Sequence, residues 1–253
     1  MVERHLCDAS HSERQVWKAS TRTAEKAFVV SDCEQLLGRD EKQFCEQIFI
    51  PYHERDQQAF RYGSWLRRFV VALHWKVLVT RNLVYPQGIE IAFSDAEKDW
   101  RRFLLGESDS LEKSDIHIFF LAVIKDASGP PLPTKMNWYF ARSIDSTPFH
   151  SESGNAGVYA KLVKIMTVSF LTVRDRERER WKGTEVHEEG MVSSPQSIET
   201  LSLGPFLEER ARIVEHSSGQ LTPRQREAFY REALRDPGRI SASESARTAL
   251  AVC

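Results

Sequence analysis

The sequence has no long apolar run and no excess of charge of either sign. Its longest apolar stretches, residues 68–79 and 116–124, are shorter than the roughly 20 residues that a membrane-spanning helix needs. The 35 basic residues stand against 36 acidic ones, for a net charge of -1, so no overall field draws the protein to nucleic acid or to an anionic membrane. We therefore expect no association with a membrane, and any binding to a polyanion must come from a local patch.

Cysteine is scarce as well, and the N-terminus lacks an apolar segment. The four cysteines are scattered without the spacing of a disulfide framework. The first 14 residues contain nothing like the apolar part of a secretory signal. Both features favour a reducing compartment, and we predict a cytoplasmic protein.

Several common functional motifs are also missing. The sequence contains no glycine-rich phosphate loop, no Gly-x-Ser-x-Gly nucleophile motif and no dinucleotide-binding fingerprint. These absences weaken the case for the common nucleotide-binding and hydrolase classes.

The first part of the chain has the apolar spacing of helices, behind a polar, irregular arm over residues 1–30. Ser31 and Asp32 are good N-cap residues, and apolar residues then recur at mostly helical intervals. This pattern predicts a first helix that ends at Pro51, because proline lacks the N–H that a helix interior needs.

Two further helices complete a helical region over residues 31–106. From Ser64, apolar residues follow the i, i+3, i+4, i+7 pattern of a long helix with one buried face. Ser94 and Glu97 form a capping box, which predicts a third helix that ends at Gly106.

The composition then changes to short runs of aromatic and β-branched residues separated by turn-forming residues, which predicts an antiparallel sheet. The expected strands lie within residues 115–124, 135–144, 157–163 and 164–173, and a weaker fifth strand lies within residues 183–192. Two helices follow, one around residues 206–214 and one in which Thr222 is the N-cap and Pro223 the first helical residue.

This order of elements predicts an α+β fold with an N-terminal helical region, a central antiparallel sheet and C-terminal helices. The strand-rich region with its terminal helices covers residues 107–236, and residues 237–253 form a flexible tail. The change in composition near residues 106–113 is the candidate subdomain boundary.

Candidate zinc ligands lie near the N-terminus. Zinc in proteins prefers four sulfur or nitrogen ligands, usually presented as two close pairs. Cys7 and His11 can supply one pair, but Cys33 has Val30 where a Cys-x-x-Cys pair needs its first cysteine. Cys45 lies about three helical turns further on. The alternative is that Cys33 and Cys45 are small buried apolar residues.

The segment from Ser31 to Val79 resembles a group of uncharacterised bacterial proteins related to the HNH and treble-clef endonucleases. In that family a second cysteine pair, Leu-Cys-x-x-Cys-Glu, opens a helix, and Cys33 with Glu34 match its end. The resemblance continues through the segments IHIFF, NWYFARSID and RWKGTEVHEEG to the terminal helices. It implies a treble-clef ancestor and a zinc site.

The departures from the family bear on activity. Val30 replaces one cysteine of the second pair, and the N-terminal segment lacks the first pair and the His-Ile-Ile-Pro-like motif. An HNH nuclease needs a histidine to activate water, and only His11 stands in a position to be that base. We predict a degenerate, non-catalytic remnant that binds nucleic acid or a partner. The alternatives are an active metal-dependent nuclease that uses Cys7, His11 and Cys33, and a protein–protein interaction module.

Arginines beside aromatic residues on the predicted helices are the candidates for contacts with DNA. The same side chains can instead rim an apolar face and extend to water. These candidates are Arg61, Arg67, Arg68, Arg101 and Arg102.

Three other groups of polar residues have both a functional and a structural interpretation. Glu185 and His187 would project from one face of a strand, as an acid/base pair or metal ligands, or else lie in an exposed strand end. Asp145 and His150 fall in a loop-like stretch, which is either a catalytic loop or an ordinary turn rich in Ser and Asp. We expect His74, beside the apolar face of the long helix, to be a hydrogen-bonded core residue.

Overall fold

The computed structural model combines helices with antiparallel sheets, which confirms the α+β class. The structure describes residues 31–80, 89–111, 114–121, 139–140, 143–150, 156–172, 183–194, 196, 204–219, 223–235 and 238.

The first helical segment continues through Pro51. α1 (Ser31–Phe44) passes into a π-helical turn, η1 (Cys45–Phe49), and then into α2 (Ile50–Glu54). The prediction that the helix ends at Pro51 is wrong, because Pro51 lies in the first turn of α2, where its missing N–H costs little. The π-helical turn connects α1 to α2 without a break in the helix, because Ile50 N–H donates to Cys45 O.

The long helix α3 (Ser64–Thr80) confirms the predicted central helix. α4 (Glu90–Leu104) begins four residues before the expected capping box, so Ser94 lies inside the helix and the predicted start is wrong. The predicted end is confirmed, because Gly106 has φ of 71°, a conformation that glycine adopts without strain.

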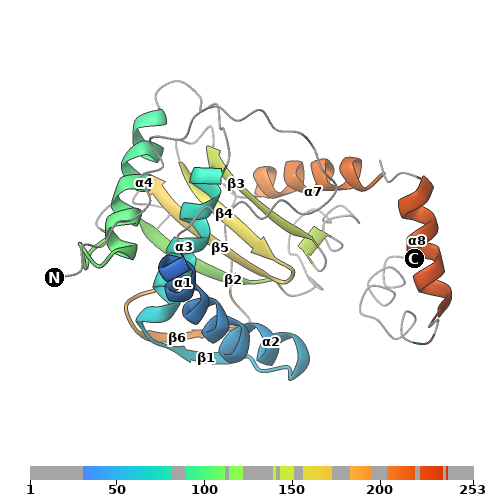
Figure 1. The fold of residues 1–253 in the computed structure, drawn as a ribbon, viewed down its shortest axis with the longest axis horizontal. Coiled ribbons are helices and arrows are strands. Elements are labelled where there is room, and N and C mark those ends of the chain that lie inside the picture. Colours follow the sequence, from blue (N-terminus) through green and yellow to red (C-terminus); the bar gives the residue numbers. More distant parts are fainter. Residues whose placement is uncertain are drawn as a thin grey trace.

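The main sheet has four antiparallel strands in the order β2-β5-β4-β3. Figure 1 shows the strands side by side, with α3 and α4 crossing the sheet. The strands are β2 (Asp115–Phe120), β3 (Ile144–His150), β4 (Ala156–Leu162) and β5 (Ile165–Thr172).

Three of the predicted strands are confirmed, and the strand expected over residues 135–144 is wrong. Tyr139 and Phe140 are helical, and β3 starts at Ile144, where the prediction ended. The structure therefore has a strand where Asp145 and His150 were assigned to a loop. Pro148 lies in β3, which is tolerated because β3 is at the edge of the sheet.

A second, two-stranded sheet pairs distant segments. β1 (Ala59–Tyr62), which the sequence did not predict, runs antiparallel to β6 (Gly190–Ser193). The weak fifth strand predicted over residues 183–192 is thus divided between this pair and a single bridge from Glu185 to β2.

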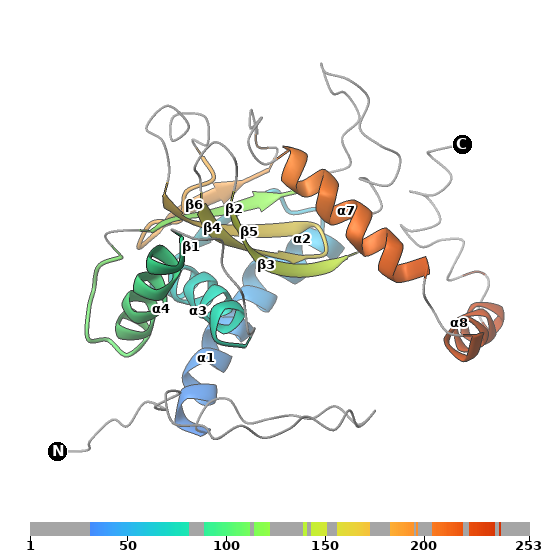
Figure 2. The same cartoon turned by 90° about the horizontal axis from the view of Figure 1, so that it is seen from above.

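Two apolar cores pack against the main sheet. Figure 2 shows helices on both faces of the sheet, with α3 and α4 on one face. The larger core joins α3 and α4 to β2, β4 and β5, and includes the fully buried Trp100. The smaller core lies under α7 (Gly204–Gly219). α8 (Pro223–Arg235) begins at the predicted Pro223 and extends away from the sheet.

None of the helices in the described part of the chain combines the length and the apolar character needed to cross a membrane. Buried side chains of the larger core come from both sides of the boundary expected near residues 106–113, with Trp100 and Ile116 in the same cluster.

Candidate functional site

A pocket of about 390 Å³ lies where the start of β2 meets the segment 183–189. Most of the side chains that line it can carry charge. The lining residues are Arg67, Ser114, Asp115, Ile116, His117, Glu185, Val186, His187 and Glu188.

Backbone hydrogen bonds attach this segment to the free edge of β2. Ile118 N–H donates to Thr184 O over 2.8 Å, and Val186 N–H donates to Ile116 O over 2.8 Å. Glu185 lies opposite His117 as an isolated antiparallel bridge. These bonds hold the pocket's wall against the sheet, and they place Glu185 and Val186 on opposite faces of the strand.

Tyr62 of β1 fixes the next part of the wall. Its hydroxyl accepts the N–H of His187 at 3.1 Å and donates to Glu185 O at 3.4 Å. Burial raises the pKa of Tyr62, so the phenol stays protonated and can donate. A side chain at Gly190 would approach the same hydroxyl to 2.9 Å, which explains why glycine occupies that position in β6.

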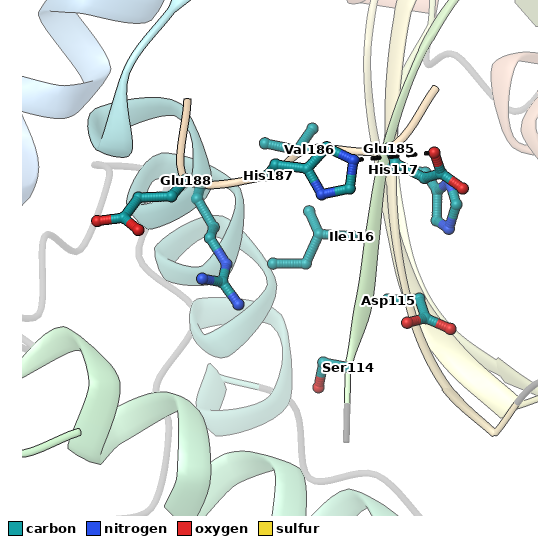
Figure 3. A pocket seen from close by; sticks show the side chains of 9 residues that line it. Ser114, Asp115, Ile116, His117, Glu185, Val186, His187 and Glu188 are labelled. Carbon is teal, nitrogen blue, oxygen red and sulfur yellow. Dashed lines mark ion pairs between the residues drawn. The ribbon is translucent and has the colours of Figure 1, made fainter. Parts of the chain in front are cut away.

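Glu185 and His187 come together, as their spacing predicted. His187 Nε2 lies 3.9 Å from Glu185 Oε2, and 72% of the His187 side chain is exposed. Figure 3 marks this ion pair across the edge of the strand. An exposed pair of this kind contributes little to stability and remains available to a ligand.

The charged groups of the pocket do not converge on one point. In Figure 3, Asp115, His117 and Glu185 lie on one side of the strand, while Glu188 lies on the other side and points away from them. Within the described ranges, no three His, Cys, Asp or Glu side chains are placed to hold a metal ion. The site therefore presents charge along a strand edge instead of concentrating it.

His117 connects the pocket with the smaller core. It is 3% exposed, and its Nδ1 lies 2.9 Å from Thr184 Oγ1. Its ring also packs edge-on against Phe170, with 5.4 Å between centroids. These contacts hold the imidazole in one orientation beside Glu185.

The candidate zinc ligands and the candidate base can be placed only in part. Cys7 and His11 lie outside the described residues, and Cys33 lies in α1 without a described side chain. Cys45 is an exposed free thiol at the start of the π-helical turn, which differs from the expectation of a buried residue. The packed face of this helical segment carries Phe44 and Ile48, and Cys45 lies beside that face. The zinc site and the catalytic role of His11 stay predictions.

Two of the predicted DNA-contacting arginines are engaged within the protein. Arg68 makes a bidentate pair with Asp40, at 2.9 and 2.7 Å, and the Asp40 side chain is only 2% exposed. The hydrogen bonds to Asp40 raise the pKa of Arg68. Arg101 lies 3.6 Å from Glu97 on the same helix. Arg68 in particular joins α3 to α1 and is poorly placed to contact phosphate.

The other three arginines are not gathered into one patch by any contact within the described part of the chain. The guanidinium of Arg67 lies 5.4 Å from the centre of the Phe103 ring and also lines the pocket. Arg61 on β1 and Arg102 on α4 are exposed.

His74 is a hydrogen-bonded core residue, as expected. Its Nδ1 lies 2.6 Å from Ser169 Oγ and its Nε2 lies 3.0 Å from Thr167 Oγ1. Because the Thr167 hydroxyl donates to Ala160 O, it must accept from Nε2–H, and Ser169 then donates to Nδ1. Complete burial lowers the pKa of His74 to about 3, which keeps the ring neutral.

A buried charged cluster on the opposite face of the sheet was not predicted. Asp145 accepts hydrogen bonds from Arg210 of α7 at 2.9 and 2.7 Å, and also from the hydroxyls of Tyr139 and Tyr159. Arg210 holds the pKa of Asp145 low against the effect of its burial. The pKa of Arg210 is raised by the same hydrogen bonds. The only sequence signal was a carboxylate among turn-forming residues, which favoured a loop.

Lys161 lies beside this cluster and is fully buried. Its Nζ donates to Ser143 O at 2.8 Å, to Ser143 Oγ at 3.1 Å and to Val163 O at 2.6 Å. Burial lowers the pKa of Lys161 to about 7. A lysine near the end of a β-strand gave no sign that it would be buried, because lysine is almost always exposed.

No family model matches the chain, and neither a curated protein nor a solved structure matches it. The resemblance to the HNH and treble-clef endonucleases therefore stays a prediction from the sequence.

Proposed function

We propose that the chain is a non-catalytic binding protein whose pocket beside β2 receives a positively charged group of a protein partner. The observation that carries the proposal is the charge of the lining, which has three carboxylates, on Asp115, Glu185 and Glu188, against the single guanidinium of Arg67. A pocket of this charge attracts a lysine or arginine side chain and repels phosphate.

The arrangement of these groups supports binding more than catalysis. A general base must lie within hydrogen-bond reach of the proton that it removes. For the exposed pair of His187 and Glu185, that proton would have to arrive on a reacting group from outside the protein. The carboxylates lie on both sides of the strand edge, so a partner would contact them one at a time along its surface.

A nucleic-acid partner is the second candidate, and it rests on the remaining arginines. Arg61 and Arg102 are exposed, and no ion pair or side-chain hydrogen bond engages them within the described part of the chain. Such side chains are available to phosphates. The acidic pocket counts against a nucleic-acid partner near Arg67, because Arg67 lies among the carboxylates of its lining.

Two charge substitutions with opposite effects separate the candidates. We expect Glu185→Gln to weaken binding of a fluorescent oligolysine peptide by about threefold, as for the loss of one exposed ion pair, and Arg67→Gln to strengthen it. Binding to a fluorescent duplex DNA would respond with the opposite signs. Fluorescence anisotropy at two salt concentrations measures both, and Glu107→Gln, an exposed charge change on another surface, is the matched control.

Other results would replace the proposal. Peptide binding that does not distinguish Glu185→Gln from Glu107→Gln contradicts a role for the pocket. DNA binding that falls with charge reversal at Arg61 and Arg102, and steeply with salt, would favour the nucleic-acid candidate. Zinc near one per chain, together with plasmid cleavage that is lost in Cys33→Ala, would favour an active nuclease.

A further inference from the structure

α8 presents an exposed apolar row away from the body of the protein. The helix lies beyond the end of α7 and extends away from the sheet (Figures 1 and 2). Tyr230 is 64% exposed and Leu234 is 77% exposed, and their separation of four residues puts them on one face of the helix. Neighbouring large apolar side chains on a surface are typical of a region that another molecule covers.

A row of arginines runs beside this apolar row. Arg224, Arg231 and Arg235 are exposed, and a turn of about 100° per residue places them within about 40° of one another around the helix axis. α8 carries four arginines against two glutamates. The pair of Arg231 with Glu227, at 3.4 Å, is exposed and therefore weak. The exposed face of α8 thus combines apolar contact with positive charge.

The strand edge beside β2 has the complementary properties. Glu185 and Glu188 line the pocket there, and three residues further along the chain Met191 is 63% exposed. The Cα atoms of Glu185 and Glu188 lie at most about 10 Å apart, and the rise of the helix separates Arg224 from Arg231 by about 10 Å. The carboxylates can therefore meet the row of arginines, and Met191 can meet the apolar row.

The two surfaces belong to different ends of one molecule. In both views α8 lies well apart from β2, with α7 leading out to it from the sheet (Figures 1 and 2). The Arg210–Asp145 ion pair and the apolar contacts of Leu207 and Ala211 attach α7 to the sheet. The α8 of the same chain is thus held away from the pocket, whereas a second copy brings both surfaces in equal number.

We propose that α8 of one copy docks along the strand edge beside β2 of a second copy. The row of arginines contacts Glu185 and Glu188, and Tyr230 and Leu234 contact Met191. This inference rests on the proposed function, because it names a second copy as the partner that supplies the positive charge. Two copies can make the contact twice around a two-fold axis, so the expected product is a dimer.

Sedimentation velocity of the full chain, over about a hundredfold range of concentration, tests the proposal. We expect the dimer fraction to rise with concentration. The helix variant, Arg224→Glu with Arg231→Glu, and the pocket variant, Glu185→Lys with Glu188→Lys, should each raise the dissociation constant of the dimer about tenfold, because attraction becomes repulsion. An equal mixture of the two should restore the dimer, since each helix then faces a pocket of opposite charge. Lys98→Glu, a charge reversal at an exposed lysine of α4, should change nothing.

Binding of the fluorescent oligolysine peptide separates this inference from the proposed function. The helix variant has the native pocket, so it should still bind the peptide although it dimerises weakly. A wild type that stays monomeric but binds the peptide through Glu185 would overturn the docking of α8 and leave the proposed function in place. Loss of peptide binding as well would overturn both.

Two further results would also overturn the docking of α8. The first is a mixture of the helix and pocket variants that stays monomeric although circular dichroism shows both to be folded. The second is a monomeric wild type that binds vesicles containing phosphatidylserine and loses this binding in the helix variant, which would assign the row of arginines to a lipid surface.

Discussion

The two faces of the four-stranded sheet bury polar groups in different ways. On the face covered by α3 and α4, His74 is neutral and is satisfied by the hydroxyls of Thr167 and Ser169. On the face covered by α7, the ion pair of Asp145 and Arg210 is largely buried, and Lys161 is fully buried beside it. Alternate residues of β5 serve the two faces, so the difference comes from what packs above each face.

This difference relates the helices that pack on each face of the sheet to the polar groups buried beneath them. α3 and α4 supply a wide apolar surface, and a neutral imidazole adds no desolvated charge to it. The described side chains of α7 combine apolar contacts with an ion pair to the sheet. A buried ion pair gives limited net stability, but it penalises wrong arrangements strongly.

Removing the carboxylate of the α7 face should have the largest effect. We expect Asp145→Asn to lower the free energy of unfolding by about 3 kcal/mol, because the largely buried guanidinium of Arg210 then lacks its anion. Chemical denaturation measures this change. Glu209→Gln, at an exposed ion pair of the same helix, should cost no more than about 0.5 kcal/mol. Equal losses in the two variants would contradict the comparison of the faces.

The α3 face should respond to acid. The pKa of His74 is about 3 in the folded protein, against 6.5 for an ordinary histidine, so its contribution to stability is complete above pH 6.5 and is lost as the pH falls toward 3. We expect it to account for about 2 kcal/mol between pH 7 and pH 5.

Denaturation of the wild type and of His74→Gln at both pH values isolates this contribution. The variant should lack that part of the acid sensitivity, whereas His187→Gln, at an exposed histidine, should retain it. An unchanged pH profile in His74→Gln would show that His74 is not buried as a neutral ring.

The α7 face should respond in a different pH range, and more weakly. The pKa of Lys161 is lowered from 10.5 to about 7, so the folded protein binds fewer protons than the unfolded chain between these values, and stability rises with pH across that range. Three acceptors surround the ammonium, so we expect a rise of less than about 2 kcal/mol from pH 7 to pH 8.5. Lys161→Gln should abolish the rise and Lys98→Gln, at an exposed lysine, should not. A rise that persists in Lys161→Gln would assign it to another group.

Local signals in the sequence predicted individual elements well where one residue type decides the backbone. Gly106 ends α4 in a left-handed conformation, and Pro223 begins α8. The period of the apolar residues found α3, and the β-branched runs found β2, β4 and β5. The errors arose where local chemistry and pairing disagree, as at Asp145, whose turn-forming neighbours are held in β3 by β4.

The candidate site was predicted in part for the same reason. The proximity of Glu185 and His187 follows from their separation by one residue, and the structure confirms it. The rest of the pocket depends on the bridge between Glu185 and His117 and on the bond from His187 N–H to Tyr62, which join segments far apart in the chain. Spacing along the chain carries no information about such pairs.

The sequence by itself determined the α+β class, the central helix and the order of most elements. Side chains repeat every 3.6 residues in a helix and every 2 in a strand, and the apolar residues of the sequence recur with these periods. Only the tertiary structure decided which charges are buried and which are available. Arg68 and Arg210 resemble the other arginines along the chain, but each faces a buried carboxylate from another element, Asp40 and Asp145 respectively. An ionisable group's environment, and hence its role, is set by the neighbours that folding brings to it.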